Sequence, residues 1–182
     1  MNENKIKILA ISGSLRSNSS NTALVRAIAN LSPKNIDFTI YNGLGDLPHF
    51  NPDIDIDDHE PPAVKDLRTQ LKEADGVLIC TPEYGNGVPG VLKNALDWIV
   101  SSGEFMNKPT AVISASPSPM GGDKAHASLL LTLKMIDATI VEGGTMMIPH
   151  IGLKLNKEGI ITDLDTKQKL LSVLWMLEQA CH

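Results

Sequence analysis

Apolar residues along this chain form two kinds of pattern, short uninterrupted runs and longer stretches that repeat every three to four positions. Uninterrupted runs such as residues 76–81 are typical of strands buried on both faces. Residues 36–41 instead alternate apolar and polar side chains, as a strand at a sheet edge does. The expected strands are 5–12, 36–41, 76–81, 110–115 and 139–148, the last interrupted by Gly143 and Gly144.

The stretches with the longer repeat predict amphipathic helices. In the first of them Leu24, Ala27, Ile28 and Leu31 form one stripe, which ends before Pro33. Pro89 stands near the start of another, where the missing N–H of proline is tolerated. The expected helices are 21–31, 63–74, 88–99, 124–136 and 163–181.

Strands that alternate with helices imply a parallel sheet with helices on both faces. Right-handed crossovers leave few topologies, and the strand order 2-1-3-4-5 is expected. Ligands of such sheets bind beyond the carboxyl ends of the strands, where the strand order reverses. The loops 13–21, 82–90 and 116–123 follow the three most apolar strands, so we expect them to converge there.

The first of these loops combines the start of a helix with many polar side chains. A helix N-terminus offers free N–H groups and a partial positive charge to an anion, and Arg16 can grip phosphate oxygens. The loop has neither GxGxxG nor GxxxxGK[ST], so a phosphate monoester suits it better than a dinucleotide or a P-loop ligand. Ser and Asn are also ordinary helix caps, which leaves both interpretations open. The loop hydroxyls are Ser14, Ser17, Ser19, Ser20 and Thr22.

The second loop, residues 81–90, is dense in Gly and Pro. Glycine lets the backbone approach a flat ligand closely, and Tyr84 could cover or flank such a ring. Taken alone, the segment is better explained as an ordinary strand-to-helix turn, and the ring interpretation depends on its place beside the first loop. A third feature is the Pro- and Asp-rich stretch 43–62, because loops of that length in compact domains are usually functional.

Composition narrows the classes of function. The 182 residues are 42% apolar and 20% charged, as expected of a single globular domain over 1–182. The net charge of −5 argues against a nucleic-acid partner. No apolar stretch approaches the roughly 20 residues of a membrane span, and residues 1–7 lack a signal core. We therefore expect a soluble, cytoplasmic protein that does not bind membranes.

Cysteine, histidine and acidic residues show no metal-binding arrangement. Cys80 and Cys181 stand far apart and outside any CxxC motif, so reduced thiols are expected. The five histidines have no ligand spacing. Four acidic side chains in the long loop lack a calcium-loop pattern and are expected to be solvated: Asp53, Asp55, Asp57 and Asp58.

Four segments together resemble the NADPH-dependent FMN reductase family, which includes quinone, azo-dye and chromate reductases. They are GSLRSNSSN at 13–21, DLPHFNPDID at 46–55, TPEY at 81–84 with VPGVLKNALDW at 88–98, and SPSPMGG at 116–122. The resemblance implies a flavodoxin-like three-layer α/β sandwich that binds FMN. It also implies NADPH or NADH as electron donor, a small-molecule acceptor such as a quinone, and a homodimer or homotetramer paired through the helix after Pro89. The contacts expected to form part of that interface are Val91, Leu92, Ala95 and Trp98 or their neighbours; the alternative is that this stripe only faces the sheet.

The resemblance also assigns residues to the cofactor. The FMN phosphate falls to Ser14, Arg16, Ser19, Asn21 and Thr22, and the neighbouring hydroxyl of Ser20 is a further candidate. The isoalloxazine falls to Pro82, Glu83, Tyr84, Gly85 and Asn86, with Ser116, Gly121 and Gly122 along its other side. No side chain is expected to act as acid or base, since the flavin carries the chemistry.

Two positions depart from the family pattern. Where the family reads Asn then Gly after the loop tyrosine, this chain has Gly85 then Asn86, and Pro119 stands where relatives tend to have glycine. Two other classes of protein fit the same loops. One is a flavodoxin-type carrier that holds FMN without oxidising NADPH, although such carriers are usually more acidic than this chain. The other is an α/β enzyme that uses the first loop for a sugar phosphate.

Overall fold

Five parallel strands form a sheet in the order β2-β1-β3-β4-β5, as the apolar pattern predicts. The computed structural model describes residues 5–56 and 59–182, so Asp57 and Asp58 of the acidic loop and residues 1–4 lie outside it. The strands are β1 (Ile6–Ser12), β2 (Ile36–Tyr41), β3 (Gly76–Thr81), β4 (Pro109–Ala115) and β5 (Thr139–Ile148).

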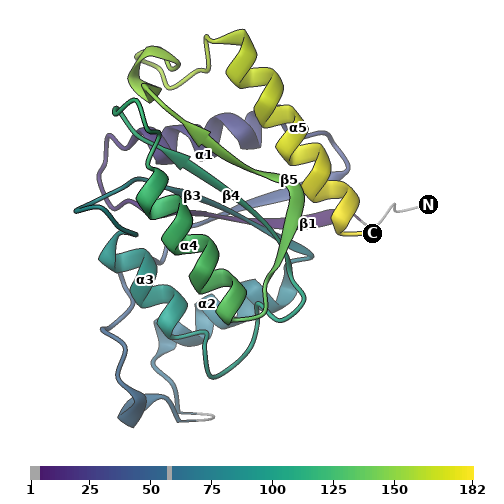
Figure 1. Ribbon diagram of the computed structural model, residues 1–182. Coiled ribbons are helices and arrows are strands. Elements are labelled where there is room, and N and C mark those ends of the chain that lie inside the picture. The colour runs from purple at the N-terminus through teal and green to yellow at the C-terminus, as the bar shows by residue number, and fades with distance from the viewer. Residues whose placement is uncertain (1–4, 57–58) are drawn as a thin grey trace.

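Helices cover both faces of this sheet, as Figure 1 shows. On one face lie α1 (Ser20–Leu31) and α5 (Leu164–Ala180). On the other lie α2 (Pro62–Glu73), α3 (Gly90–Asp97) and α4 (Asp123–Met135). Each face has its own apolar core, so the molecule is a three-layer, flavodoxin-like α/β sandwich.

Burial explains why the strands differ in pattern. All six residues of the central strand β3 are buried, which is why its sequence is an uninterrupted apolar run. In the edge strand β2 buried and exposed residues alternate, and its sequence alternates accordingly. The register of β5 against β4 shifts between Thr110 and Val112, opposite the expected interruption at Gly143. The glycine there has a left-handed backbone, which accommodates the irregularity.

One segment was not expected from the sequence. Between β5 and α5 the chain forms a 3₁₀ turn, Ile151–Leu153, and then an antiparallel bridge between Leu155 and Ile161. We call residues 155–161 the hairpin. It is too short for a periodic signal, and its indications in the sequence are Asn156 and Gly159 at turn positions.

The expected dimer contacts on α3 are wrong for three of the four residues. Leu92, Ala95 and Trp98 are 0%, 2% and 0% exposed, so their side chains pack in the core between α3 and the sheet. Val91 alone is partly exposed. The apolar stripe of this short helix packs against the sheet of its own chain, so a subunit interface would need other residues.

Cys80 is buried and Cys181 partly buried, and both are free thiols. Burial raises the pKa of the Cys80 thiol, which keeps it protonated and unreactive.

Among the residues that the structure describes, no helix is long and apolar enough to cross a membrane. Within the same residues, no three His, Cys, Asp or Glu side chains lie together as a metal site would require.

The burial of the α3 stripe predicts an effect on stability. Leu92→Ala should lower the free energy of unfolding by about 2–5 kcal/mol, because it leaves a cavity in the core. Leu131→Ala is the matched control, since Leu131 is 71% exposed on α4 and its loss should change stability by less than about 0.5 kcal/mol. Urea denaturation measures both. Equal losses in the two variants would contradict the packing described for α3.

Candidate functional site

The loops after β1, β3 and β4 meet at the carboxyl edge of the sheet, as the topology predicts. Ser14 Oγ and Tyr84 OH share a hydrogen bond of 3.0 Å, which joins the first loop to the second. The Glu83 carboxylate accepts from the backbone N–H groups of Lys124 and Ala125 at 2.9 and 3.0 Å, which joins the second loop to the start of α4. Asn21 Nδ2 donates to Ala115 O at 3.0 Å and links α1 to the end of β4. These contacts join the first two loops to each other and to the elements on either side of the third loop, the end of β4 and the start of α4.

The first loop ends in a capped helix with spare donors. Ser19 Oγ accepts from Thr22 N at 3.3 Å, and the Thr22 hydroxyl pairs with Ser12 Oγ at 2.8 Å. Among the described residues, the N–H groups of Ser17, Asn18 and Ser20 donate no hydrogen bond within the chain. They leave the start of α1 able to bind an anion.

Two polar side chains in this loop have no hydrogen-bond or ion-pair partner for one of their groups within the described residues, and a ligand could supply it. Arg16 is exposed and forms no ion pair with any described carboxylate. Asn21 is 3% exposed, and its Oδ1 is a buried acceptor without a donor. A buried acceptor of this kind costs free energy unless something donates to it. A phosphate monoester attached to a hydroxylated chain fits both, because the phosphate would pair with Arg16 and a hydroxyl would donate to Asn21.

The second loop contains a tight two-residue turn. Gly85 and Asn86 have φ values of 56° and 60°, and Tyr84 and Gly87 exchange two backbone hydrogen bonds of 3.1 Å. Such a turn needs a left-handed backbone at both central positions, where Gly and Asn are the tolerated residues. The order Gly-Asn therefore satisfies the same turn as Asn-Gly. The departure from the family pattern moves the asparagine side chain by one position, within a turn whose left-handed backbone both residues tolerate.

Glu83 has a structural role that the sequence did not reveal. Its carboxylate accepts the free N–H groups of the first turn of α4, whose own N-cap is Gly122 and has no capping side chain. The signal in the sequence is indirect: the helix after Gly122 begins without a capping side chain of its own, so an acidic residue from another loop could cap it.

The third loop is organised by serines and by the glycine pair. Ser114 Oγ donates to Gly121 O at 2.8 Å, and Ser116 Oγ accepts from Ser118 N at 3.1 Å. Gly121 and Gly122 are both buried at the end of the loop. Pro119, the second departure from the family pattern, lies at the exposed tip. The backbone of the glycine pair is thus set by contacts in which Pro119 takes no part.

A hollow of about 440 Å³ lies between the first loop and the start of α3. Its lining is mostly apolar and includes Tyr84, which is 43% exposed. A volume in this range holds a flat ligand of moderate size. The residues that line it are Leu15, Arg16, Tyr84, Pro89, Gly90 and Val91.

The only described histidine buried near these loops is His126, in the first turn of α4. Burial lowers the pKa of His126, and its Nδ1 has no hydrogen-bond partner. The imidazole is therefore neutral at neutral pH, and it contributes no positive charge to the site.

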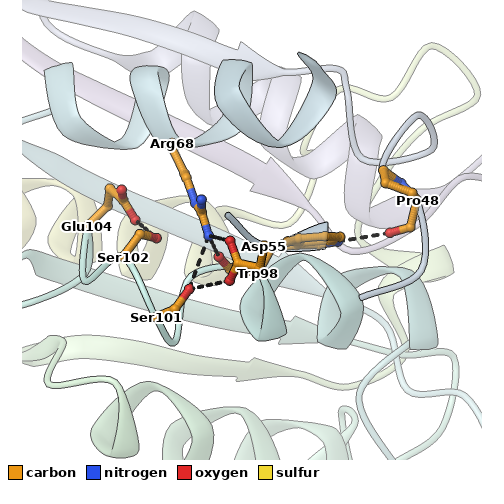
Figure 2. A network of polar contacts seen from close by, with 7 residues as sticks. All are labelled: Pro48, Asp55, Arg68, Trp98, Ser101, Ser102 and Glu104. Atoms are coloured by element: carbon orange, nitrogen blue, oxygen red, sulfur yellow. Dashed lines mark hydrogen bonds and ion pairs between the residues drawn. The ribbon is translucent and has the colours of Figure 1, made fainter. Parts of the chain in front are cut away.

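The long loop after β2 is fastened to α2 and α3 by a polar network, shown in Figure 2. Arg68 Nη2 donates to Asp55 Oδ1 at 2.8 Å and to Trp98 O at 2.6 Å. Ser101 Oγ donates to the second oxygen of the Asp55 carboxylate. Arg68 and Asp55 are only 12% and 8% exposed, so solvent screens this ion pair weakly. Contrary to expectation, Asp55 is not a solvated loop residue.

The same loop is also held at its start. Trp98 Nε1 and Asn94 Nδ2 each donate to Pro48 O at 2.9 Å, as Figure 2 shows for the tryptophan. The rings of Phe50 and Trp98 meet edge to face with centroids 5.1 Å apart. These contacts place the long loop beside α3, the helix that borders the 440 Å³ hollow.

Comparisons with known proteins agree with this architecture. The family model for NADPH-dependent FMN reductase matches residues 6–152. A 2-hydroxy-1,4-benzoquinone reductase of Burkholderia sp is 34% identical over 168 residues, which cover 91% of this chain and 90% of that protein. An NAD(P)H-dependent FMN reductase of Pseudomonas aeruginosa is 34% identical over 175 residues, covering 95% and 94% of the two chains.

A solved structure is also similar over almost the whole chain. It is FerB, a flavoenzyme NAD(P)H:(acceptor) oxidoreductase from Paracoccus denitrificans. The TM-score is 0.76 at 30% identity, and the match covers 97% of this chain and 95% of that one.

The Asp55–Arg68 contact predicts a pH dependence of stability. Burial alone would raise the pKa of Asp55, but hydrogen bonds from Ser101 and Arg68 and the arginine charge outweigh it and lower this pKa. The stabilisation is therefore present at neutral pH and is lost as the pH falls below about 4. Asp55→Asn should cost about 1–3 kcal/mol of unfolding free energy at pH 7.

Urea denaturation across pH measures this effect. The difference between the wild type and Asp55→Asn should shrink as the pH falls below about 4. Asp165→Asn is the control, because Asp165 pairs with Lys169 on an exposed face of α5 and should change stability little. A difference for Asp55→Asn that stays constant across this pH range would contradict the account.

Proposed function

The chain belongs to the NADPH-dependent FMN reductase family, and from that premise we propose that it reduces quinones and similar small acceptors at the carboxyl edge of its sheet. The protein is an FMN-dependent oxidoreductase that uses NAD(P)H. The observation that carries the proposal is the meeting of the three loops through Ser14, Tyr84, Glu83 and Asn21. It supports one continuous site for a phosphate, a hydroxylated chain and a flat ring.

In this proposal the first loop holds the cofactor phosphate. The free N–H groups before α1 and the unpaired Arg16 guanidinium donate to the phosphate oxygens. Asn21 accepts a hydrogen bond from the chain of hydroxyls that follows the phosphate. Further contacts to this part of FMN are assigned to the loop hydroxyls of Ser14, Ser19, Ser20 and Thr22.

The second and third loops hold the ring, mainly through their backbones. The turn at Gly85 and Asn86 presents main-chain groups to the polar edge of the ring, with Pro82, Glu83 and Tyr84 before it and Ser116, Gly121 and Gly122 on the other side. When bound, FMN supplies the redox chemistry, accepting hydride from NAD(P)H and passing two electrons to the acceptor. The chain's own part is to bind, to orient and to leave one ring face open beside the 440 Å³ hollow.

The acceptor class follows from the lining of that hollow. Leu15, Tyr84 and Val91 offer apolar surface to a flat molecule, whereas Arg16 is the only charged side chain in the lining. Specificity usually comes from buried polar groups that a wrong substrate leaves unpaired, and this lining has few. The benzoquinone reductase relative supports quinones as one such acceptor. Azo compounds and free flavins fit the same description.

An electron carrier that holds FMN without oxidising NAD(P)H is the other candidate. The hollow beside the ring site favours the enzyme, because a carrier needs no pocket for a nicotinamide.

We further propose that residues 1–182 act as a single domain in the cytoplasm, consistent with two free thiols. A homodimer or homotetramer is proposed as well, through residues other than Leu92, Ala95 and Trp98.

The proposed phosphate site predicts how tightly different flavins bind. FMN should bind far more tightly than riboflavin, because only FMN carries the anion that the start of α1 can receive. Arg16→Ala should weaken FMN binding by about 1.5–3 kcal/mol, roughly 10- to 100-fold. Arg16→Lys is the matched control and should fall between the two, since it keeps the charge and loses the fork. Quenching of flavin fluorescence measures the affinities, and equal binding of riboflavin would refute the phosphate site.

The second prediction concerns the order of reaction. If the nicotinamide and the acceptor occupy the same hollow, they cannot be bound at the same time. Initial rates with NADPH and a quinone should then give parallel double-reciprocal lines. Intersecting lines would show that donor and acceptor bind together, and separate sites would be required.

A further inference from the structure

A groove outside the FMN site runs along α1. Two hollows of about 460 and 290 Å³ lie between this helix and the hairpin 155–161. They share Ala23, Arg26, Glu158 and Gly159, so they adjoin where Gly159 lies against Ala23, and we call the two hollows together the groove. Its near end is lined by residues 17–20, which belong to the proposed phosphate loop. The groove therefore begins where the FMN phosphate would lie and extends along the helix toward Leu31.

The outer wall of the groove is held by specific contacts. Asn156 Oδ1 accepts from Glu158 N at 3.1 Å and from Ile160 N at 2.8 Å, and Gly159 N donates to Asn156 O at 3.0 Å. Gly159 has a φ of +77°, and a Cβ there would come within 3.2 Å of Ala23 Cβ. Glycine thus allows the hairpin to lie directly on α1, and the wall is shaped by its own hydrogen bonds.

The lining combines an apolar floor with a cationic rim. The apolar part, which we call the floor, consists of Ala23, Ala27, Leu31, Ile160 and Ile161. Ile160 is 60% exposed and the other four are half-buried. Three cations line the rim, Arg26, Lys157 and Lys167, and none of them forms an ion pair with a described carboxylate. Glu158 is the one acidic residue in the lining. The rim is therefore positive in a chain whose net charge is −5.

We infer that this groove binds the 2′-phosphoadenosine end of NADPH while the nicotinamide lies in the 440 Å³ hollow. The apolar floor suits a purine, and the cationic rim suits a phosphate dianion. A free phosphate would not contact the apolar floor, and an apolar ligand would leave the charged rim without a partner. The inference rests on the proposed function, since it assigns a site to the electron donor of that reaction. It makes NADPH the preferred donor over NADH.

Binding of 2′,5′-ADP tests the inference without measuring activity. Isothermal titration of the protein as purified, in low salt, should show that 2′,5′-ADP binds more tightly than 5′-AMP. Arg26→Ala should weaken 2′,5′-ADP binding by about tenfold, the loss expected for a hydrogen bond to a charged group. Lys167→Ala should weaken it as well. Lys65→Ala is the matched control, because Lys65 is exposed on α2 across the sheet, and it should bind as the wild type does.

Each outcome decides the inference. Unchanged 2′,5′-ADP binding in Arg26→Ala and Lys167→Ala overturns it, and so does equal weakening in Lys65→Ala. The AMP half of FAD has similar chemistry, so a loss of FAD binding without a loss of 2′,5′-ADP binding would also overturn it. Failure of the proposed function is a separate observation, since it would appear as a wild type that neither binds FMN nor oxidises NADH.

Discussion

The hydrogen bonds that tie three loops together at the carboxyl edge of the sheet are the constraint on which the site depends. A parallel sheet brings the ends of β1, β3 and β4 to one edge, but it does not determine how the loops fold there. Ser14 with Tyr84 and Asn21 with Ala115 join the segments directly. Glu83 adds a third link by capping α4. These contacts fix the start of α1 relative to the turn at Gly85 beyond what the pairing of β1 with β3 determines.

The second constraint is the attachment of the long loop to α3. The Asp55–Arg68 pair and the hydrogen bonds to Pro48 O hold this loop at two points, Pro48 and Asp55 (Figure 2). Trp98 takes part in both, through its indole N–H and its backbone carbonyl. Because α3 borders the hollow beside Tyr84, the stability of this network bears on the shape of the open side of the site.

The sheet and most helices could be predicted because their signals are periodic. The buried strands and the order of elements appear directly in the apolar pattern, and right-handed crossovers then leave few topologies, among which the expected order 2-1-3-4-5 is the one found. The residues of the first loop were nominated because hydroxyls and an arginine before a helix can bind a phosphate, and their contact with FMN stays a prediction. Glu83 was predicted only as a ring contact, because a helix cap from a residue 41 positions away leaves no local pattern. The partners of Asp55 were missed for the same reason, since Arg68 lies 13 positions away. The hairpin 155–161 was missed because it is too short to give a periodic signal.

The account makes this edge of the sheet an FMN site, and identification of the flavin bound to the purified protein tests that most directly. The protein should show flavin absorption in the visible range. The flavin released by mild acid should run on chromatography as FMN, in an amount close to one per chain. A colourless protein that takes up no FMN on titration, or one that releases only riboflavin, would contradict it.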